Sequence, residues 1–275
     1  VDWMDEKTRR RALEKIAAMT LHIAYPNELL DDRKLENYYE GLEFSVDNYL
    51  ENIYNLSIFE RNFSFSRLRQ PVNKTEWIIY GESAVNKLPA GILQGVYFNN
   101  DWPRYMNYGG IGLVIGHEIT HGIIDQGNEF NKEGNLMDWW EPETKKRFLK
   151  KAECIIHQYG NYTVEEVGLN LNGTNSQREN IADNGGTREA YYAYKEWIKR
   201  NKLEQRLPGL PYSPEQMFWI SAANLFCYKA RPKAYSHSPT EFRIRGPLSN
   251  MEEFSRDFNC PVGSRMNPMK KCTVW

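Results

Sequence analysis

The sequence has almost no net charge, because 35 Lys and Arg residues are balanced by 36 Asp and Glu residues. Such a chain has no general electrostatic attraction to polyanions, so we expect no nucleic-acid partner and no binding to anionic membrane surfaces. No apolar run approaches the roughly 20 residues that a membrane-spanning helix needs. Hydrophobic residues make up 41% of the 275 residues, which is typical of a globular protein with an ample core.

Cysteine is also scarce, and none of the four cysteines lies in a C-x-x-C pair. This argues against a cysteine zinc site and against a thioredoxin-type redox site. Two disulfides can join four cysteines in three ways, and spacing does not choose among them. N-x-S/T sequons occur at Asn55, Asn62, Asn73, Asn161 and Asn172. Well-separated cysteines together with these sequons favour an extracellular or lumenal glycoprotein.

Hydrophobic periodicity predicts a mainly α fold with a small β-sheet. Helices are expected over residues 5–19, 34–59, 109–125, 141–159, 178–199, 214–228 and 250–258. Short aromatic and β-branched runs predict strands at 77–80 and 91–98. The change in pattern predicts a helical lead-in over residues 1–65 and a main domain over residues 66–275. We interpret the Tyr191–Trp197 cluster as helix packing rather than as a ligand site.

The most informative motif is H-E-x-x-H, spelled by His117, Glu118 and His121 after an apolar run. Positions i and i+4 share one face of a helix, so both imidazoles can reach one metal ion. Glu118 is close enough to take a proton from a metal-bound water, which is why the spacing is typical of zinc peptidases. The alternative is an amphipathic core helix with two partly exposed histidines, and the motifs further along the chain disfavour it.

A catalytic zinc site needs a third protein ligand and an open fourth position. The metzincin continuation is excluded, because Ile124 and Gly127 stand where that class requires Gly and His. Glu179, on a later predicted helix, is the favoured third ligand. Asp183 lies four residues further on the same face and can accept the outer N–H of a ligating histidine. The alternative for Glu179 is a carboxylate that interacts with the start of the helix dipole.

Two further residues have the chemistry that peptide hydrolysis requires. His237, in a polar loop, can donate to the oxyanion of a tetrahedral intermediate. Arg243 can bind a substrate carbonyl or carboxylate through a pair of hydrogen bonds. An aminopeptidase is less favoured, because that class places its glutamate much closer to H-E-x-x-H.

Five segments together resemble the neprilysin family of zinc endopeptidases, which includes the endothelin-converting enzymes. They are Val114–Gly122, Glu179–Gly186, Pro89–Gln94, His237–Arg243 and Cys272–Trp275. The resemblance runs from Val1 to Trp275 and implies a thermolysin-like gluzincin catalytic domain. It implies one Zn²⁺ per chain and site roles for the following residues: His117, His121 and Glu179 as ligands, Glu118 as base, Asp183 orienting a ligand, His237 at the oxyanion and Arg243 on the substrate backbone.

The resemblance also implies a substrate and a cellular setting. Family members cut oligopeptides on the amino side of hydrophobic residues, and the pocket for that side chain maps to Ile92, Tyr97, Leu113, Val114, Leu225 and Phe226. Cys154 would pair with Cys272, whereas Cys227 and Cys260 would pair with cysteines outside this sequence. The chain would be the C-terminal part of a longer cell-surface or secreted enzyme, reaching the membrane only through an N-terminal anchor outside it.

Three departures from the family pattern motivate a second hypothesis. The segment Ser83–Pro89 is about ten residues shorter than its family counterpart, which holds substrate as an added strand, and Asn86 is taken as the surviving Asn. The loop before His237 is short and has Tyr235 in place of the family's Asp. The usual H-G-F-D-D continuation reads His121–Asp125 with one acid fewer. The second hypothesis is therefore a pseudo-peptidase or fragment that binds zinc but is catalytically impaired.

Overall fold

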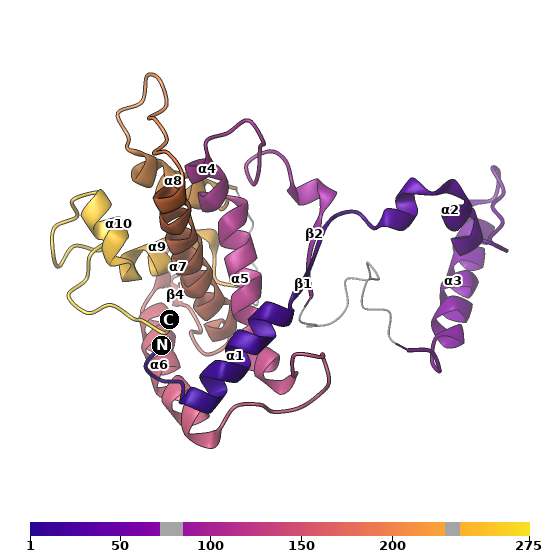
Figure 1. Ribbon diagram of the computed structural model, residues 1–275, viewed down its shortest axis with the longest axis horizontal. Coiled ribbons are helices and arrows are strands. Elements are labelled where there is room, and N and C mark those ends of the chain that lie inside the picture. The colour runs from indigo at the N-terminus through magenta and orange to yellow at the C-terminus, as the bar shows by residue number, and fades with distance from the viewer. Residues whose placement is uncertain (72–84, 229–236) are drawn as a thin grey trace. The chain divides into compact units, whose positions relative to one another are not determined.

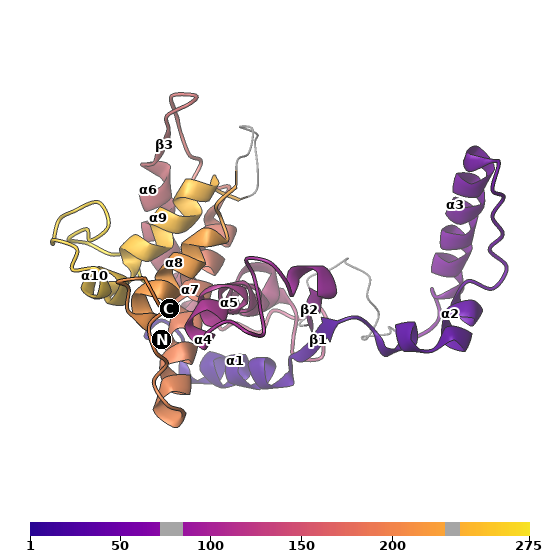
Figure 2. The ribbon, with the colours of Figure 1, turned by 90° about the horizontal axis from the view of Figure 1, so that it is seen from above.

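The computed structural model describes residues 1–71, 85–228 and 237–275 (Figures 1 and 2). In chain order its elements are α1 (Glu6–Ala18), β1 (Thr20–Ala24), η1 (Asn27–Leu30), α2 (Asp32–Tyr38), α3 (Tyr49–Ser66), β2 (Val85–Pro89), η2 (Ala90–Ile92), α4 (Arg104–Gly109), α5 (Ile111–Ile123), η3 (Asp125–Glu129), α6 (Pro142–Gly160), β3 (Thr163–Val164), β4 (Leu169–Asn170), α7 (Gln177–Arg200), α8 (Pro214–Asn224), α9 (Thr240–Asn250) and α10 (Glu252–Asp257). The η elements are 3₁₀ helices. Two-stranded sheets form from β1 with β2 and from β3 with β4. The predicted fold class, mainly α with little β, is confirmed.

The chain divides into two compact units, one of residues 1–21 with 81–275 and one of residues 22–80. The smaller unit contains α2 and α3, neither of which has a buried residue among those described. Within it, Tyr38 packs edge-on against Phe63, with ring centroids 5.1 Å apart. Because α1 belongs to the larger unit, the first helix of the predicted lead-in packs with the elements that carry the H-E-x-x-H motif. The boundary near residue 65 stays a prediction.

Most predicted helices are confirmed within a few residues, but two predicted elements are wrong. The helix expected over 34–59 is interrupted between α2 and α3, where Gly41 has a φ of +82°. That left-handed conformation ends a helix and favours glycine. The strand expected over 91–98 is instead η2 followed by turns, with Gly95 at a φ of +62°. The strand expected over 77–80 lies outside the described residues.

Two hydrophobic clusters form the core of the larger unit. The first packs α1, α6 and the C-terminal segment together around Trp3, Trp140, Ile155 and Tyr159. The second contains Tyr105, Tyr191, Tyr194, Phe218 and Trp219 and packs α7 against α4 and α8. Helices α5, α7 and α9 each contribute residues to both clusters, so these three helices join the two parts of the core. The interpretation of the tyrosine cluster as core is confirmed.

The two ends of the chain meet at the first cluster (Figures 1 and 2). The indole N–H of Trp3 donates to the Val274 carbonyl at 2.6 Å. A disulfide joins Cys154 on α6 to Cys272, with Cα atoms 5.6 Å apart, so the pairing implied by the family resemblance is confirmed. Cys227 and Cys260 are free thiols in this chain. The C-terminal segment is therefore fixed covalently to α6 and packed against Trp3, ahead of α1.

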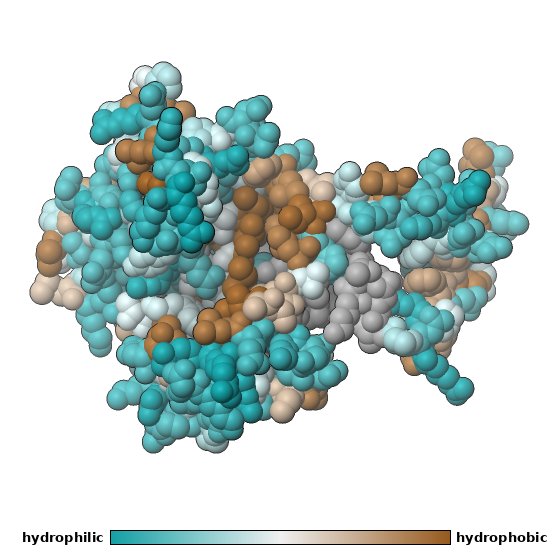
Figure 3. All heavy atoms as spheres, in the orientation of Figure 1, coloured by the Kyte–Doolittle hydropathy of each residue, from teal (hydrophilic) through white to brown (hydrophobic). Residues whose placement is uncertain are grey.

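Helix α5, which carries the H-E-x-x-H motif, is rich in apolar residues, and some of them lie at the surface of the molecule. Figure 3 shows hydrophobic residues gathered in a column over α5, flanked by hydrophilic surface. Ile115 and Ile119, on the side of the helix away from His117, are half-buried. At 13 residues, α5 is too short to span a bilayer. None of the helices in the described part of the chain is long and apolar enough to do so.

We expect Trp3→Ala to lower the free energy of unfolding by about 3–5 kcal/mol, because it leaves a cavity next to the rings of Trp140, Phe148 and Trp275. Trp3 is 2% exposed and packs on Trp140 at 5.1 Å and Phe148 at 5.2 Å between ring centroids. Urea unfolding followed by circular dichroism measures the change. Leu13→Ala on α1, at a side chain 62% exposed, is the control and should change little. Equal effects of the two substitutions would contradict this account of the core.

A pH dependence follows from Glu189 on α7, which accepts a hydrogen bond from Thr120 of α5 at 3.3 Å. Burial raises the pKa of Glu189 from its ordinary 4.5 to about 7. Between these values the folded chain keeps a proton that the unfolded chain releases, so the free energy of unfolding falls as pH rises from about 4.5 to 7. Glu189→Gln should therefore stabilise the chain at pH 8 by up to about 3 kcal/mol and have little effect at pH 4.

Thermal unfolding at the two pH values checks this expectation. Glu196→Gln, a change at an exposed carboxylate of the same helix, is the control. A stabilisation of the Glu189→Gln variant that is the same at pH 4 and pH 8 would show that the Glu189 carboxyl is not responsible.

Candidate metal centre

Helices α5 and α7 lie side by side and approach each other at two glycines (Figure 1). A Cβ added to Gly116 would lie 2.8 Å from the Gly186 Cα, and one added to Gly186 would lie 2.4 Å from the His117 backbone N. No side chain fits in either place. The two backbones are therefore in direct contact, which brings the His117 side chain of α5 next to the acidic residues of α7.

Three ligand-type atoms from these helices form a nearly equilateral triangle. The Nε2 atoms of His117 and His121 are 3.1 Å apart, and each lies 3.3 Å from Oε2 of Glu179. Zinc binds such atoms tetrahedrally at about 2.0–2.1 Å, and the edge of that tetrahedron is about 3.3 Å. The donor types and their spacing thus fit a zinc ion. The structure brings the three sequence-predicted ligands close together, and their assignment as ligands stays a prediction.

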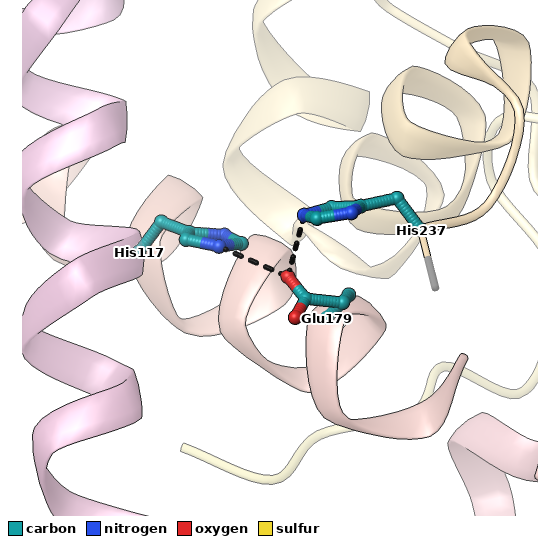
Figure 4. A group of neighbouring side chains, drawn as sticks. All are labelled: His117, Glu179 and His237. Carbon is teal, nitrogen blue, oxygen red and sulfur yellow. Dashed lines mark ion pairs between the residues drawn. The ribbon is translucent and has the colours of Figure 1, made fainter. Parts of the chain in front are cut away.

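His237, from the segment ahead of α9, reaches the same carboxylate oxygen as His117 (Figure 4). Its Nε2 lies 2.8 Å from Oε2 of Glu179, and its ring is nearly parallel to that of His117 at 6.3 Å between centroids. The ligand atoms of His117, Glu179 and His237 all lie within 4.8 Å of one another. Both His121 and His237 are thus close enough to complete a three-residue metal site.

Asp183 connects His117 to Arg243. Its Oδ1 lies 2.9 Å from Nδ1 of His117, which turns Nε2 of that ring toward Glu179. Arg243 donates to both carboxylate oxygens of Asp183, from Nε at 2.8 Å and from Nη2 at 2.7 Å. The guanidinium also lies over the Phe226 ring, 4.7 Å from its centroid. Arg243, predicted to contact substrate, therefore also anchors the residue that orients His117.

The electrostatics of the site keep both carboxylates ionised. Burial alone would raise the pKa of Glu179, but hydrogen bonds with His117, His121 and His237 lower it well below its usual range. Burial acts against ionisation of Asp183 as well, and Arg243 and His117 nevertheless lower its pKa. Burial opposes protonation of His117, yet its bonds to Asp183 and Glu179 raise its pKa to about 9. Without a metal, the two carboxylates therefore compensate the positive charges of Arg243 and His117, and a bound cation would replace the proton on Nε2 of His117.

The remaining predicted residues lie at several other positions in the larger unit. Glu118 is exposed on α5, and its charge contributes to the raised pKa of His117. Five of the predicted pocket residues belong to or pack against the second hydrophobic cluster: Tyr97, Leu113, Val114, Leu225 and Phe226. Ile92 lies in η2, half-buried and outside that cluster as described. Asn86 lies in β2, and its side chain is outside what the structure describes.

Fold and site together define a zinc-peptidase type of protein, with histidines and a glutamate from two crossing helices meeting at one point. The chain belongs to peptidase family M13, whose model matches residues 80–274. The predicted resemblance to the neprilysin family is thereby confirmed. The chain is 51% identical over 100% of its length to Neprilysin-2 of Drosophila melanogaster, and 44% identical over 99% to Neprilysin of Homo sapiens.

Solved structures show the same similarity. The zinc metalloprotease Zmp1 of Mycobacterium tuberculosis, in complex with inhibitor, superposes with a TM-score of 0.88 at 29% identity and covers 100% of this chain. A Haemonchus galactose-containing glycoprotein complex gives a TM-score of 0.88 at 32% identity over 99% of this chain. The chain spans 38% and 39% of the length of the two curated relatives and 44% and 45% of the two solved chains.

Two residues beside the site had no role in the sequence analysis. Asn180 follows Glu179 and is fully buried, and Ser238 follows His237 and is 5% exposed. A hydrogen bond of 2.8 Å joins their side chains. Both stand within the family motifs, but nothing in the sequence pairs an Asn with a Ser that lies so far along the chain.

The α5–α7 crossing yields a prediction about zinc. Gly186→Ala should weaken zinc binding by about 10- to 100-fold, because the new methyl group pushes His117 away from Glu179. A chelator competition assay measures the dissociation constant. Gly112→Ala is the matched control on α5, since its Cβ would meet Asn107 at an ordinary 3.5 Å. Unchanged zinc affinity in Gly186→Ala would show that the helix contact does not set the ligand spacing.

Proposed function

We propose that this chain is the catalytic part of a zinc endopeptidase that hydrolyses oligopeptides. The observation that carries the proposal is the ligand triangle of His117, His121 and Glu179, whose edges match those of a tetrahedral zinc site. We assign the third ligand to His121 rather than His237. The 2.8 Å contact of His237 with Glu179 is shorter than a ligand–ligand edge and is that of a hydrogen bond.

The chain's own residues supply the proton transfers. Zinc bound there would acidify a water molecule and polarise the scissile carbonyl. Glu118, exposed one residue beyond His117, accepts the proton of the attacking water and passes it to the leaving nitrogen. His237 donates a hydrogen bond to the developing oxyanion. Asp183 keeps Nδ1 of His117 as the donor, which leaves Nε2 free to ligate.

We further propose that substrates are cut on the amino side of hydrophobic residues. Leu113 on α5, together with Leu225 and the ring of Phe226 directly after α8, supplies an apolar lining. Arg243 lies directly over Phe226, so its remaining N–H groups are placed to donate to a substrate carbonyl next to that lining. The disulfide and the exposed sequons at Asn161 and Asn172 support an extracellular or cell-surface setting.

The alternative of an impaired peptidase rests on the two shortened segments. Residues 72–84 and 229–236 lie outside the described part of the chain, and these gaps contain Ser83 and Tyr235. The alternative therefore stays a prediction and is decided by activity.

The test is hydrolysis of a quenched fluorescent oligopeptide by the zinc-loaded chain. Glu118→Gln should retain one zinc per chain and lose turnover by about 10²–10⁴-fold, since it removes the general base. Glu179→Ala should lose the metal, because it removes a ligand. Glu196→Gln, at an exposed carboxylate of α7, is the control for loss of a charge. Cleavage that survives both Glu118→Gln and chelation would refute the mechanism, and no cleavage by the fully loaded chain would favour the impaired form.

The zinc content of two variants distinguishes the proposed role of His121 from that of His237. We expect His121→Ala to lose zinc, measured by atomic absorption after dialysis. His237→Ala should keep the metal and lose turnover, because its hydrogen bond acts on the transition state. The reverse pattern would exchange their roles and make His237 the third ligand.

A further inference from the structure

The bond between Ser238 and Asn180 links the segment that carries His237 to the helix that carries Glu179. Ser238 Oγ donates to Asn180 Oδ1 at 2.8 Å, and both side chains are buried. Each residue is the immediate neighbour of a member of the Glu179–His237 contact, which is also 2.8 Å long. The two contacts thus run next to each other between the same two segments.

The direction of this bond is set by a short chain of hydroxyl and amide groups. Ser176 Oγ donates its hydrogen to the Asn172 carbonyl at 3.1 Å. It can then only accept from Asn180, whose Nδ2 lies 2.9 Å away. The amide oxygen of Asn180 must therefore point to Ser238 and accept its hydroxyl hydrogen. The Asn180 side chain is held at both ends and presents a rigid acceptor to the His237 segment.

Packing alone holds the His237 side chain loosely, since it is 41% exposed. Further along the same segment, Phe242 is buried and stacks on Tyr162 at 5.0 Å between centroids, and Arg243 bonds to Asp183, but both residues lie more than one helical turn from His237. We propose that Asn180 and Ser238 are a positioning pair that holds His237 against Glu179 and hence at the place where the oxyanion develops. This inference rests on the proposed peptidase function.

The turnover number tests whether Asn180 and Ser238 position His237. Ser238→Ala should keep one zinc per chain and lower kcat by about 10- to 100-fold with little change in KM. Ser238→Thr, which keeps the hydroxyl, should restore most of the turnover. In a His237→Ala background, Ser238→Ala should have no further effect on kcat, because the group that it positions is gone. Full, additive losses in the double variant, or unchanged kcat in Ser238→Ala, would overturn the proposal.

Ser255→Ala is the matched control. Ser255 is a buried serine that bonds to the carbonyls of Met251 and Met266, away from the metal centre. Its loss removes a buried hydroxyl of the same kind and should leave kcat unchanged. A loss of kcat in Ser255→Ala equal to that in Ser238→Ala would assign the effect to general destabilisation and overturn the proposal.

A second readout does not depend on catalysis. In the zinc-free chain, the rate at which diethyl pyrocarbonate modifies His237 is followed by peptide mass spectrometry. We expect faster modification in Ser238→Ala than in the unsubstituted chain, with the exposed His157 on α6 reacting equally in both. Equal rates at His237 would overturn the pair. If the unsubstituted chain cleaves no peptide, the proposed function fails, and this readout still decides whether the pair holds His237.

Discussion

The close crossing of α5 and α7 is the constraint on which the metal centre depends. Gly116 and Gly186 allow the two backbones to touch, although glycine in a helix interior costs about 1 kcal/mol relative to alanine. In return, His117 comes within hydrogen-bond distance of Asp183 and close to Glu179. Helix α7 also contributes residues to both hydrophobic clusters. The three proposed ligand side chains are therefore carried by two helices, α5 and α7, that each pack into both clusters.

From this crossing a continuous set of contacts leads outward to the apolar lining. His117 bonds to Asp183, Asp183 is held by two bonds from Arg243, and Arg243 lies on Phe226. Asp183 is only 1% exposed, so its charge depends on both partners for compensation. A change in the lining near Phe226 thus has a physical route to the orientation of a histidine in the H-E-x-x-H motif. The metal centre and the proposed substrate pocket are one connected structure rather than two adjacent ones.

Prediction from sequence succeeded where a pattern is local and failed where helix-ending residues intervene. Helices α5, α6 and α7 follow from apolar residues at helical spacing, and their bounds differ little from those expected. Helix α9 was missed because it contains Gly246 and Pro247, two residues that normally end a helix. There, Gly246 lets the helix approach the Tyr159 ring, where a Cβ would lie 2.0 Å from its hydroxyl oxygen. Tertiary packing outweighs local propensity at that point.

The sequence by itself determined the H-E-x-x-H pair, since residues four apart on a helix share a face whatever surrounds them. The family motifs then identified Glu179, Asp183, His237 and Arg243 as neighbours of that pair. Only the tertiary structure decided that Arg243 donates hydrogen bonds to Asp183, and that Ser238 bonds to Asn180 beside the metal centre. These contacts join residues about 60 positions apart, and their distances depend on how whole helices pack. Spacing along the chain carries no information about such distances.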